Sequence, residues 1–300
     1  MNGFKVDWLQ RREPFDAAAR DRDLARQFGA VLGEMQNKPR RIVDLAAGSG
    51  ASFRALAPLL GVDQDWLLVD HDPSLIAAQA AEIARWSTRN GWHCREFDGG
   101  MLVQPGTADW RARAHALDLA QCMDQLDFAA CDGVTTTAFL DLVSTPWLER
   151  LCGLLTRSGL PLLATLTVDG RREWHPSAPA DVRVHHAFRH HQSGDKGFGP
   201  AQGGLATTYL AEHLAAQGYE ITIAHSDWRI GAEHREMLLQ MVEESTAVAL
   251  ETEPAAAAVF AGWSAERHAQ IQSGRLTLKV GHLDMLAIPS SSARSRRSRT

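Results

Sequence analysis

The feature that most constrains this chain is a short apolar run that ends in closely spaced glycines. Residues 41–50 read RIVDLAAGSG, which is typical of a buried strand followed by a tight turn. Residues 52–61 return to the three- and four-residue spacing of an amphipathic helix, and residues 66–69 form a second apolar strand. Strand, helix and strand within about 30 residues make a βαβ unit, in which the two strands run parallel. The sequence therefore predicts an α/β fold.

The same alternation of strands and helices continues along the chain. Further strands are predicted at residues 113–119, 133–137, 160–168, 219–224 and 276–288. Helices are predicted at residues 73–86, 147–155, 205–217, 233–251 and 254–273, and a Gly-rich, charged stretch from 90 to 108 is predicted to be a local insertion. This order favours a doubly wound, mostly parallel, Rossmann-like sheet of seven strands, with an antiparallel strand at one edge.

The domain organisation predicted from these patterns is one domain at residues 1–289. Its parts are an N-terminal helix at 14–36, a core at 41–168, a substrate-side loop or lid at 169–204, and the C-terminal half of the sheet at 205–289 with a helical insertion at 232–273. Residues 290–300 contain only small polar side chains, arginine and one alanine, so they are predicted to be a disordered basic tail.

The composition of the chain limits the kinds of partner that it is expected to bind. A formal charge of -5 gives no general attraction to nucleic acid, and the four arginines of the tail support at most weak, salt-sensitive contacts. No apolar run approaches the ~20 residues of a membrane span, so no membrane association is expected. The four cysteines are widely spaced and suggest neither a disulfide framework nor a metal site. We expect a cytoplasmic protein, as a monomer or homodimer, that acts on a small molecule.

The glycine turn carries the strongest chemical signal. Gly48 and Gly50 allow the backbone to turn tightly and to approach a bound cofactor. A dinucleotide-binding fingerprint would have a small residue at position 53, whereas this chain has Phe53, which we expect to crowd a pyrophosphate. Asp70 ends the second strand 20 residues after Gly50, the spacing expected of a carboxylate that binds a ribose diol. Together these residues predict a site for a nucleoside without phosphates.

In these residues the chain resembles the class I S-adenosylmethionine-dependent methyltransferases. Their first motif is an acidic residue, a spacer and GxG, matched by Asp44, Gly48 and Gly50, and their second strand ends in an acidic residue, matched by Asp70. The resemblance implies that Gly48, Ser49 and Gly50 surround the methionine part of S-adenosylmethionine. It also implies that Asp70 holds the ribose, that His71 lies against the adenine, and that Asp44 organises the glycine loop.

The resemblance leaves two further cofactor contacts open. Asp118 and Leu119 match the position after the third strand where a carboxylate meets the adenine amino group, but Asp98 is a rival because the insertion obscures which strand is third. Asp118 is equally well explained as a loop carboxylate. Thr135 is either a residue facing cofactor and substrate or a β-branched residue of the strand.

Candidate catalytic residues come from the histidine-rich segment between 169 and 204. They are His185, His186 and His190, because an imidazole side chain is suited to remove a proton from an acceptor. The alternative is a polar surface loop. No metal site is predicted, because the histidine spacing matches no metal-binding helix pattern.

The resemblance implies methyl transfer from S-adenosylmethionine to an oxygen, nitrogen or carbon atom of a small-molecule acceptor by direct in-line displacement. Two other classes remain open. One is an NAD(P)-dependent oxidoreductase on a similar sheet. The other is a non-catalytic protein that binds the cofactor or associates with nucleic acid.

Overall fold

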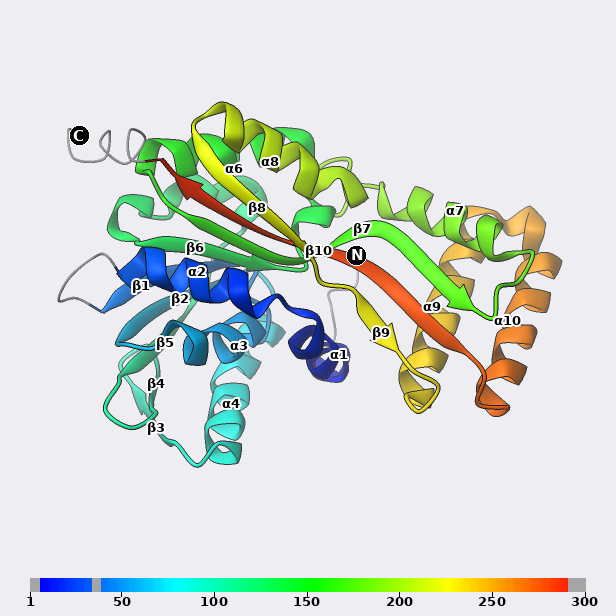
Figure 1. The fold of residues 1–300 in the computed structure, drawn as a ribbon, viewed down its shortest axis with the longest axis horizontal. Coiled ribbons are helices and arrows are strands. Elements are labelled where there is room, and N and C mark those ends of the chain that lie inside the picture. Colours follow the sequence, from blue (N-terminus) through cyan, green and yellow to red (C-terminus); the bar gives the residue numbers. More distant parts are fainter. Residues whose placement is uncertain (1–5, 34–38, 291–300) are drawn as a thin grey trace.

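The computed structural model describes residues 6–33 and 39–290, and its centre is one sheet of ten strands (Figure 1). The strand order is β3-β4-β5-β2-β1-β6-β7-β10-β8, with β9 paired to β10. The strands are β1 (Arg40–Leu45), β2 (Gln64–Asp70), β3 (His93–Phe97), β4 (Gly100–Gln104), β5 (Trp110–Ala116), β6 (Gly133–Thr137), β7 (Leu162–His175), β8 (Tyr219–His225), β9 (Trp228–Ile230) and β10 (Thr277–Pro289).

The direction of the strands confirms the predicted fold class. Strands β5, β2, β1, β6 and β7 are parallel, whereas β10 runs antiparallel between β7 and β8 and closes that side of the sheet. These seven strands are the predicted ones. The hairpin β3-β4 extends the opposite edge, and it accounts for the stretch predicted to be an insertion.

Helices cover both faces of the sheet. The helices are α1 (Val6–Ala19), α2 (Arg22–Gly33), α3 (Ala51–Leu60), α4 (Pro73–Arg89), α5 (Leu119–Cys122), α6 (Thr145–Ser158), α7 (Asp181–Gln192), α8 (Ala206–Ala216), α9 (Arg235–Thr252) and α10 (Ala257–Gln272). The alternation within β1 explains the layers: Ile42 packs with the core under α2, α3 and α4, whereas Val43 and Leu45 pack with the core under α6 and α8. Full burial of such a side chain contributes about 1.5–3 kcal/mol.

A separate lobe is built on the continuation of two strands. Strands β7 and β10 extend beyond the main sheet, pair with each other and with β9, and support α7, α9 and α10 (right-hand side of Figure 1). This lobe has its own core, which includes Trp174, Trp263 and Phe260. None of the helices within residues 6–33 and 39–290 has the length and apolar composition needed to cross a lipid bilayer.

The interpretation of residues 169–204 as one irregular loop is wrong. Strand β7 continues to His175, and α7 follows from Asp181 to Gln192. The charged residues after Val168 hid this part of the strand from the sequence pattern. The side chains of Asp169 and Arg171 are hydrogen-bonded to each other, whereas Trp174 packs in the core of the lobe and Arg172 lines a cavity beside it.

The N-terminal helix predicted at 14–36 also differs from the structure. It is two helices, α1 and α2, and Pro14 lies inside α1 and not near its start. Asp21 explains the break, since its Oδ1 accepts hydrogen bonds from the backbone N–H of Asp23 and Leu24 as an N-cap of α2. Residues 34–36 of the predicted helix and the predicted tail at 291–300 lie outside the described residues.

Candidate active site

A cavity of about 440 Å³ lies at the carboxyl ends of β1, β2 and β6, beneath α1. Ligands of open parallel sheets bind at this edge, where neighbouring connections diverge to opposite faces. Ala46 follows β1 and Ala138 follows β6, and both have positive φ, 54° and 52°. Such backbone strain in non-glycine residues is concentrated at functional sites. The cavity therefore has the position and the backbone geometry of a ligand site.

The glycine turn forms one wall of this cavity. Gly48 has φ +54°, and a Cβ atom there would lie 3.3 Å from Leu9 Cδ1 of α1. Gly48 and Ser49 line the cavity, as the sequence predicts. Gly50 has φ 84° and caps the N-terminus of α3, but it is not among the residues that line the cavity.

Asp70 anchors this turn to the end of β2. Its Oδ2 accepts a hydrogen bond from the Gly48 N–H (2.7 Å), and its Oδ1 accepts from the N–H groups of His71 (2.8 Å) and Asp72 (3.0 Å). A carboxylate offers about four lone-pair sites, so at least one remains for a ligand hydroxyl. His71 lines the same cavity and is exposed, with Nδ1 3.7 Å from Asp70 Oδ1. These positions fit the predicted nucleoside site.

Asp44 is the residue that the resemblance implies to organise the glycine loop, a role that stays a prediction. It is completely buried, and its Oδ1 accepts a hydrogen bond from the Thr135 hydroxyl (2.8 Å), so both residues join β1 to β6 behind the cavity wall. Burial raises the pKa of Asp44 to about 7, against the opposing effect of the Thr135 hydrogen bond. Thr137, two residues beyond Thr135, lines the cavity instead.

The crowding expected from Phe53 does not occur at the ligand site. Its side chain is fully buried between α3 and the sheet, with its ring centroid 5.6 Å from Trp66 and 5.7 Å from Trp86. In a dinucleotide fingerprint, the small residue at this place permits close packing of helix and strand. Phe53 therefore changes how α3 packs on the sheet, and it does not contact the ligand site.

The three candidates for the adenine contact lie outside the cavity lining. Asp118 is exposed, and its side chain caps α5 by accepting a hydrogen bond from the Ala120 N–H (2.8 Å). Leu119 is buried in the core under α6, and Asp98 is exposed in the turn of the β3-β4 hairpin. Asp118 thus has a capping role, whereas His71, Asp72 and Pro73 line this end of the cavity.

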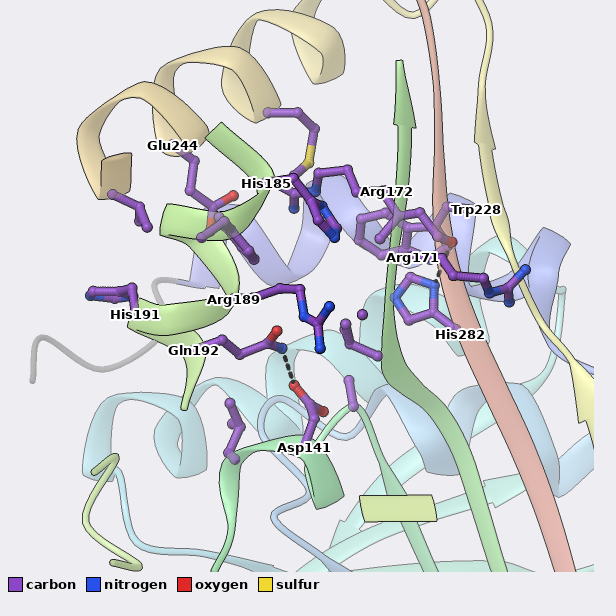
Figure 2. Close-up of a pocket in the computed structure, with 18 of the residues that line it drawn as sticks. Asp141, Arg171, Arg172, His185, Arg189, His191, Gln192, Trp228, Glu244 and His282 are labelled. Carbon is purple, nitrogen blue, oxygen red and sulfur yellow. Dashed lines mark hydrogen bonds between the residues drawn. The ribbon is translucent and has the colours of Figure 1, made fainter. Parts of the chain in front are cut away.

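A second cavity, of about 310 Å³, adjoins the first and reaches into the lobe (Figure 2). Its walls come from β7, β9 and β10, from α1, α7 and α9, and from the turn that follows β6. The two cavities share four lining residues: Arg12, Ala138, Leu142 and Lys196. They therefore meet at the end of β6, where one ligand can face the other.

The helix α1 covers the place where the cavities meet. Leu9 lines the first cavity and Trp8 the second. Arg12 Nε donates to Asp16 Oδ2 (3.0 Å), and Asp16 in turn accepts from the Trp228 indole N–H (3.0 Å). These contacts tie α1 to β9 and so hold it across both sites.

The structure separates the candidate histidines. His185 lines the second cavity, as does His191, whereas His186 and His190 are exposed and are not among its lining residues. Burial and the charges of Arg172 and Arg189 lower the pKa of His185, so its imidazole is neutral at pH 7. Its Nδ1 is buried and has no hydrogen-bond partner among the described residues.

Sequence reasoning missed three functional candidates in the second cavity. Asp141 is 4% exposed, and burial raises its pKa to about 6. His282 is buried, which lowers its pKa to about 4, and its Nδ1 lies 3.0 Å from the Val280 carbonyl. Arg172 reaches the cavity from the extension of β7. Only Asp141 had a usable signal, because it follows a strand end at the ligand-binding edge of the sheet.

One cluster has the composition of a metal site, but an arginine occupies it. Ligand atoms of Asp169, His225 and Asp227 lie within 4.8 Å of one another. Arg171 Nη2 lies 2.7 Å from Asp227 Oδ1 and 3.0 Å from His225 Nδ1, and it also bonds to Asp169. The guanidinium thus supplies the positive charge that balances the two carboxylates.

Comparison with known proteins gives similar structures but no sequence match. No family model and no curated protein matches the chain. Similar solved structures include S-adenosylmethionine-dependent methyltransferases from Geobacter sulfurreducens (13% identity, 89% of this chain and 91% of that chain, TM-score 0.40) and Thiobacillus denitrificans (13%, 94% and 98%, 0.41), both in complex with S-adenosyl-L-homocysteine. Another is the cyclopropane synthase MmaA2 from Mycobacterium tuberculosis (12%, 87% and 82%, 0.41). These similarities are distant, so we infer the function from the two cavities of the chain itself.

Proposed function

We propose that the chain transfers a methyl group from S-adenosylmethionine to a small-molecule acceptor. The observation that carries this proposal is the junction of the two cavities: a nucleoside-type site at Gly48 and Asp70 opens, at Ala138 and Leu142, into a second cavity lined by both apolar and charged side chains. A donor and an acceptor held in adjoining cavities gain the proximity that lowers the barrier of a two-substrate reaction.

The residues present fit this cofactor. Asp70 would accept hydrogen bonds from the ribose hydroxyls, Gly48 and Ser49 would allow close approach of the methionine part, and Thr137 would face it from β6. When bound, S-adenosylmethionine supplies an electrophilic methyl group on a sulfonium ion. The chain's own part is to align the acceptor, to exclude water beneath α1 and to accept a proton where the acceptor carries one.

The choice between this function and an NAD-dependent one is tested by thermal stability. A ligand that binds only the native state stabilises it by about 2.7 kcal/mol at a concentration 100 times its Kd. We expect S-adenosylmethionine and S-adenosylhomocysteine to raise the melting temperature of the purified protein, with no shift from NAD⁺ or NADH. A shift with the nicotinamide cofactors alone would replace methyl transfer by a redox function. Cofactor binding without turnover of any acceptor would favour a non-catalytic protein.

A further inference from the structure

The second cavity contains one carboxylate that is poised for a ligand. Asp141 stands in the turn after β6, beside Ala138 and Leu142, which line both cavities. Its Oδ2 accepts a hydrogen bond from the Gln192 side chain (3.1 Å; dashed in Figure 2), whereas its buried Oδ1 has no partner among the described residues. A buried polar atom without a partner is costly, so a ligand donor at Oδ1 would remove that cost.

Two arginines with no carboxylate partner among the described residues also line the cavity. Arg189 extends from α7 toward the middle of the cavity (Figure 2), and its guanidinium makes no hydrogen bond or ion pair with any residue in 6–33 or 39–290. Arg172 stacks over the Phe188 ring at 3.9 Å and donates to Ser245 Oγ (2.8 Å), which holds its guanidinium in place. Both arginines line the cavity together with His185, whose pKa is lowered first by burial and then by these two charges.

The other charges that line the cavity have partners or lie at its rim. Arg12 is paired with Asp16, Arg171 is paired with Asp169 and Asp227, and the Lys196 ammonium donates to the His191 carbonyl (3.0 Å). Glu244 of α9 is exposed and acts on Arg172 only through its charge. Arg189, which is exposed, and Arg172 are therefore the arginines of the cavity that no carboxylate pairs with among the described residues, and Lys196 adds a third positive charge where the two cavities meet.

Apolar side chains line much of the remaining wall. They are Trp228, Phe188, Val168, Met241, Val248 and Val280. A volume of about 310 Å³ lies at the lower end of the range of small-molecule sites. The cavity therefore combines an apolar wall with two arginine side chains and a proton acceptor.

We propose that the acceptor is a small organic acid that also carries a hydroxyl group, with its carboxylate bound by Arg189 and Arg172 and its hydroxyl bound by Asp141. This inference rests on the proposed methyl transfer for its chemistry, but not for its binding geometry. As the hydroxyl oxygen takes the methyl group from sulfur, its proton passes to Oδ1 of Asp141, and the electron pair of the broken carbon–sulfur bond stays on sulfur. Burial raises the pKa of Asp141 to about 6, which makes its carboxylate a stronger base than that of an exposed aspartate.

The binding part is tested by calorimetric titration of the protein alone with three acids, benzoate, 4-hydroxybenzoate and 3-(4-hydroxyphenyl)propanoate, and with the amide of each. Loss of a charge-assisted hydrogen bond weakens binding about tenfold or more. We therefore expect acids to bind at least about tenfold more tightly than their amides. Arg189→Met should reduce this preference, because only Arg172 then remains to bind the carboxylate. Arg183→Met is the matched control, because Arg183 lies on the same helix but pairs with Glu253 outside the cavity.

A separate comparison of ligand affinities tests the role of Asp141. Asp141→Asn should remove the preference for 4-hydroxybenzoate over benzoate and leave the preference of acids over amides intact. Equal binding of acids and amides, an unchanged preference in Arg189→Met, or no binding of any probe by protein that still binds S-adenosylhomocysteine would overturn the proposal. If acids bind as expected but S-adenosylhomocysteine does not, the proposed function fails while the assignment of the anion site stands.

Discussion

Replacing Asp70 with alanine is expected to lower the affinity for S-adenosylhomocysteine about 100-fold. A hydrogen bond to a charged group contributes about 1.5–3 kcal/mol, and a ribose diol offers two donors to this carboxylate. The substitution also releases the Gly48 N–H, which Asp70 Oδ2 holds at 2.7 Å. The lost hydrogen bonds to the ribose and the released glycine turn affect the same wall of the cavity, so both lower the affinity for S-adenosylhomocysteine. The measurement is the Kd from calorimetric titration with S-adenosylhomocysteine.

Two further variants make this result specific. Asp70→Asn keeps one acceptor oxygen and the shape of the side chain, so an intermediate affinity is expected. Asp65→Ala changes another carboxylate of β2, which pairs with Arg113 outside this cavity and should leave the affinity unchanged. If Asp70→Ala binds S-adenosylhomocysteine as well as Asp65→Ala does, the nucleoside site lies elsewhere.

The second large effect is expected in the lobe that carries the acceptor cavity. Arg267 is completely buried, with its guanidinium carbon 5.6 Å from the Trp174 ring centroid and 5.5 Å from that of Trp263, and Asp181 at the start of α7 is its carboxylate partner. Asp181 also accepts from the Trp263 indole N–H (2.7 Å) and from the Ala178 N–H (2.7 Å). Asp181→Ala leaves the guanidinium buried without a counter-charge, which costs about 3–5 kcal/mol.

Urea unfolding measures this loss as a lower free energy of unfolding. The matched control is Glu253→Ala, which breaks the exposed pair between Arg183 of α7 and Glu253 and should change stability little, because surface ion pairs contribute little. Since Gly48 and Asp70 lie outside the lobe, folded Asp181→Ala protein should still bind S-adenosylhomocysteine. Equal destabilisation by the two variants would mean that Asp181 does not anchor α7.

The parts of the fold that were predictable are those fixed by local pattern. The strand, glycine turn and helix around Gly48 are encoded within about 30 residues, and Asp70 closes the same unit. The residue ranges of β6 and β8 also follow from short apolar or alternating runs between turns. Four of the residues predicted from this unit to bind the cofactor, Gly48, Ser49, Asp70 and His71, line the first cavity.

The acceptor cavity depends on packing between distant segments, which no local pattern records. Arg172 and His282 meet there only because β7 and β10 extend together beyond the main sheet. The histidines were treated alike because residues 181–192 were interpreted as a loop. On the helix that forms there, His185, Phe188, Arg189 and Gln192 share the face toward the cavity, and His186 and His190 do not.

The most direct test of the central claim is a titration of the wild-type protein, Gly48→Val and Gly91→Val with S-adenosylhomocysteine. Both glycines have positive φ, but a Cβ at Gly48 meets Leu9 over the cavity, whereas one at Gly91 meets nothing within 4 Å. We expect one binding site in the wild type and in Gly91→Val, and a loss of measurable binding in Gly48→Val. Undiminished binding by folded Gly48→Val, or no binding by the wild type, would contradict a methyl-donor site at the glycine turn.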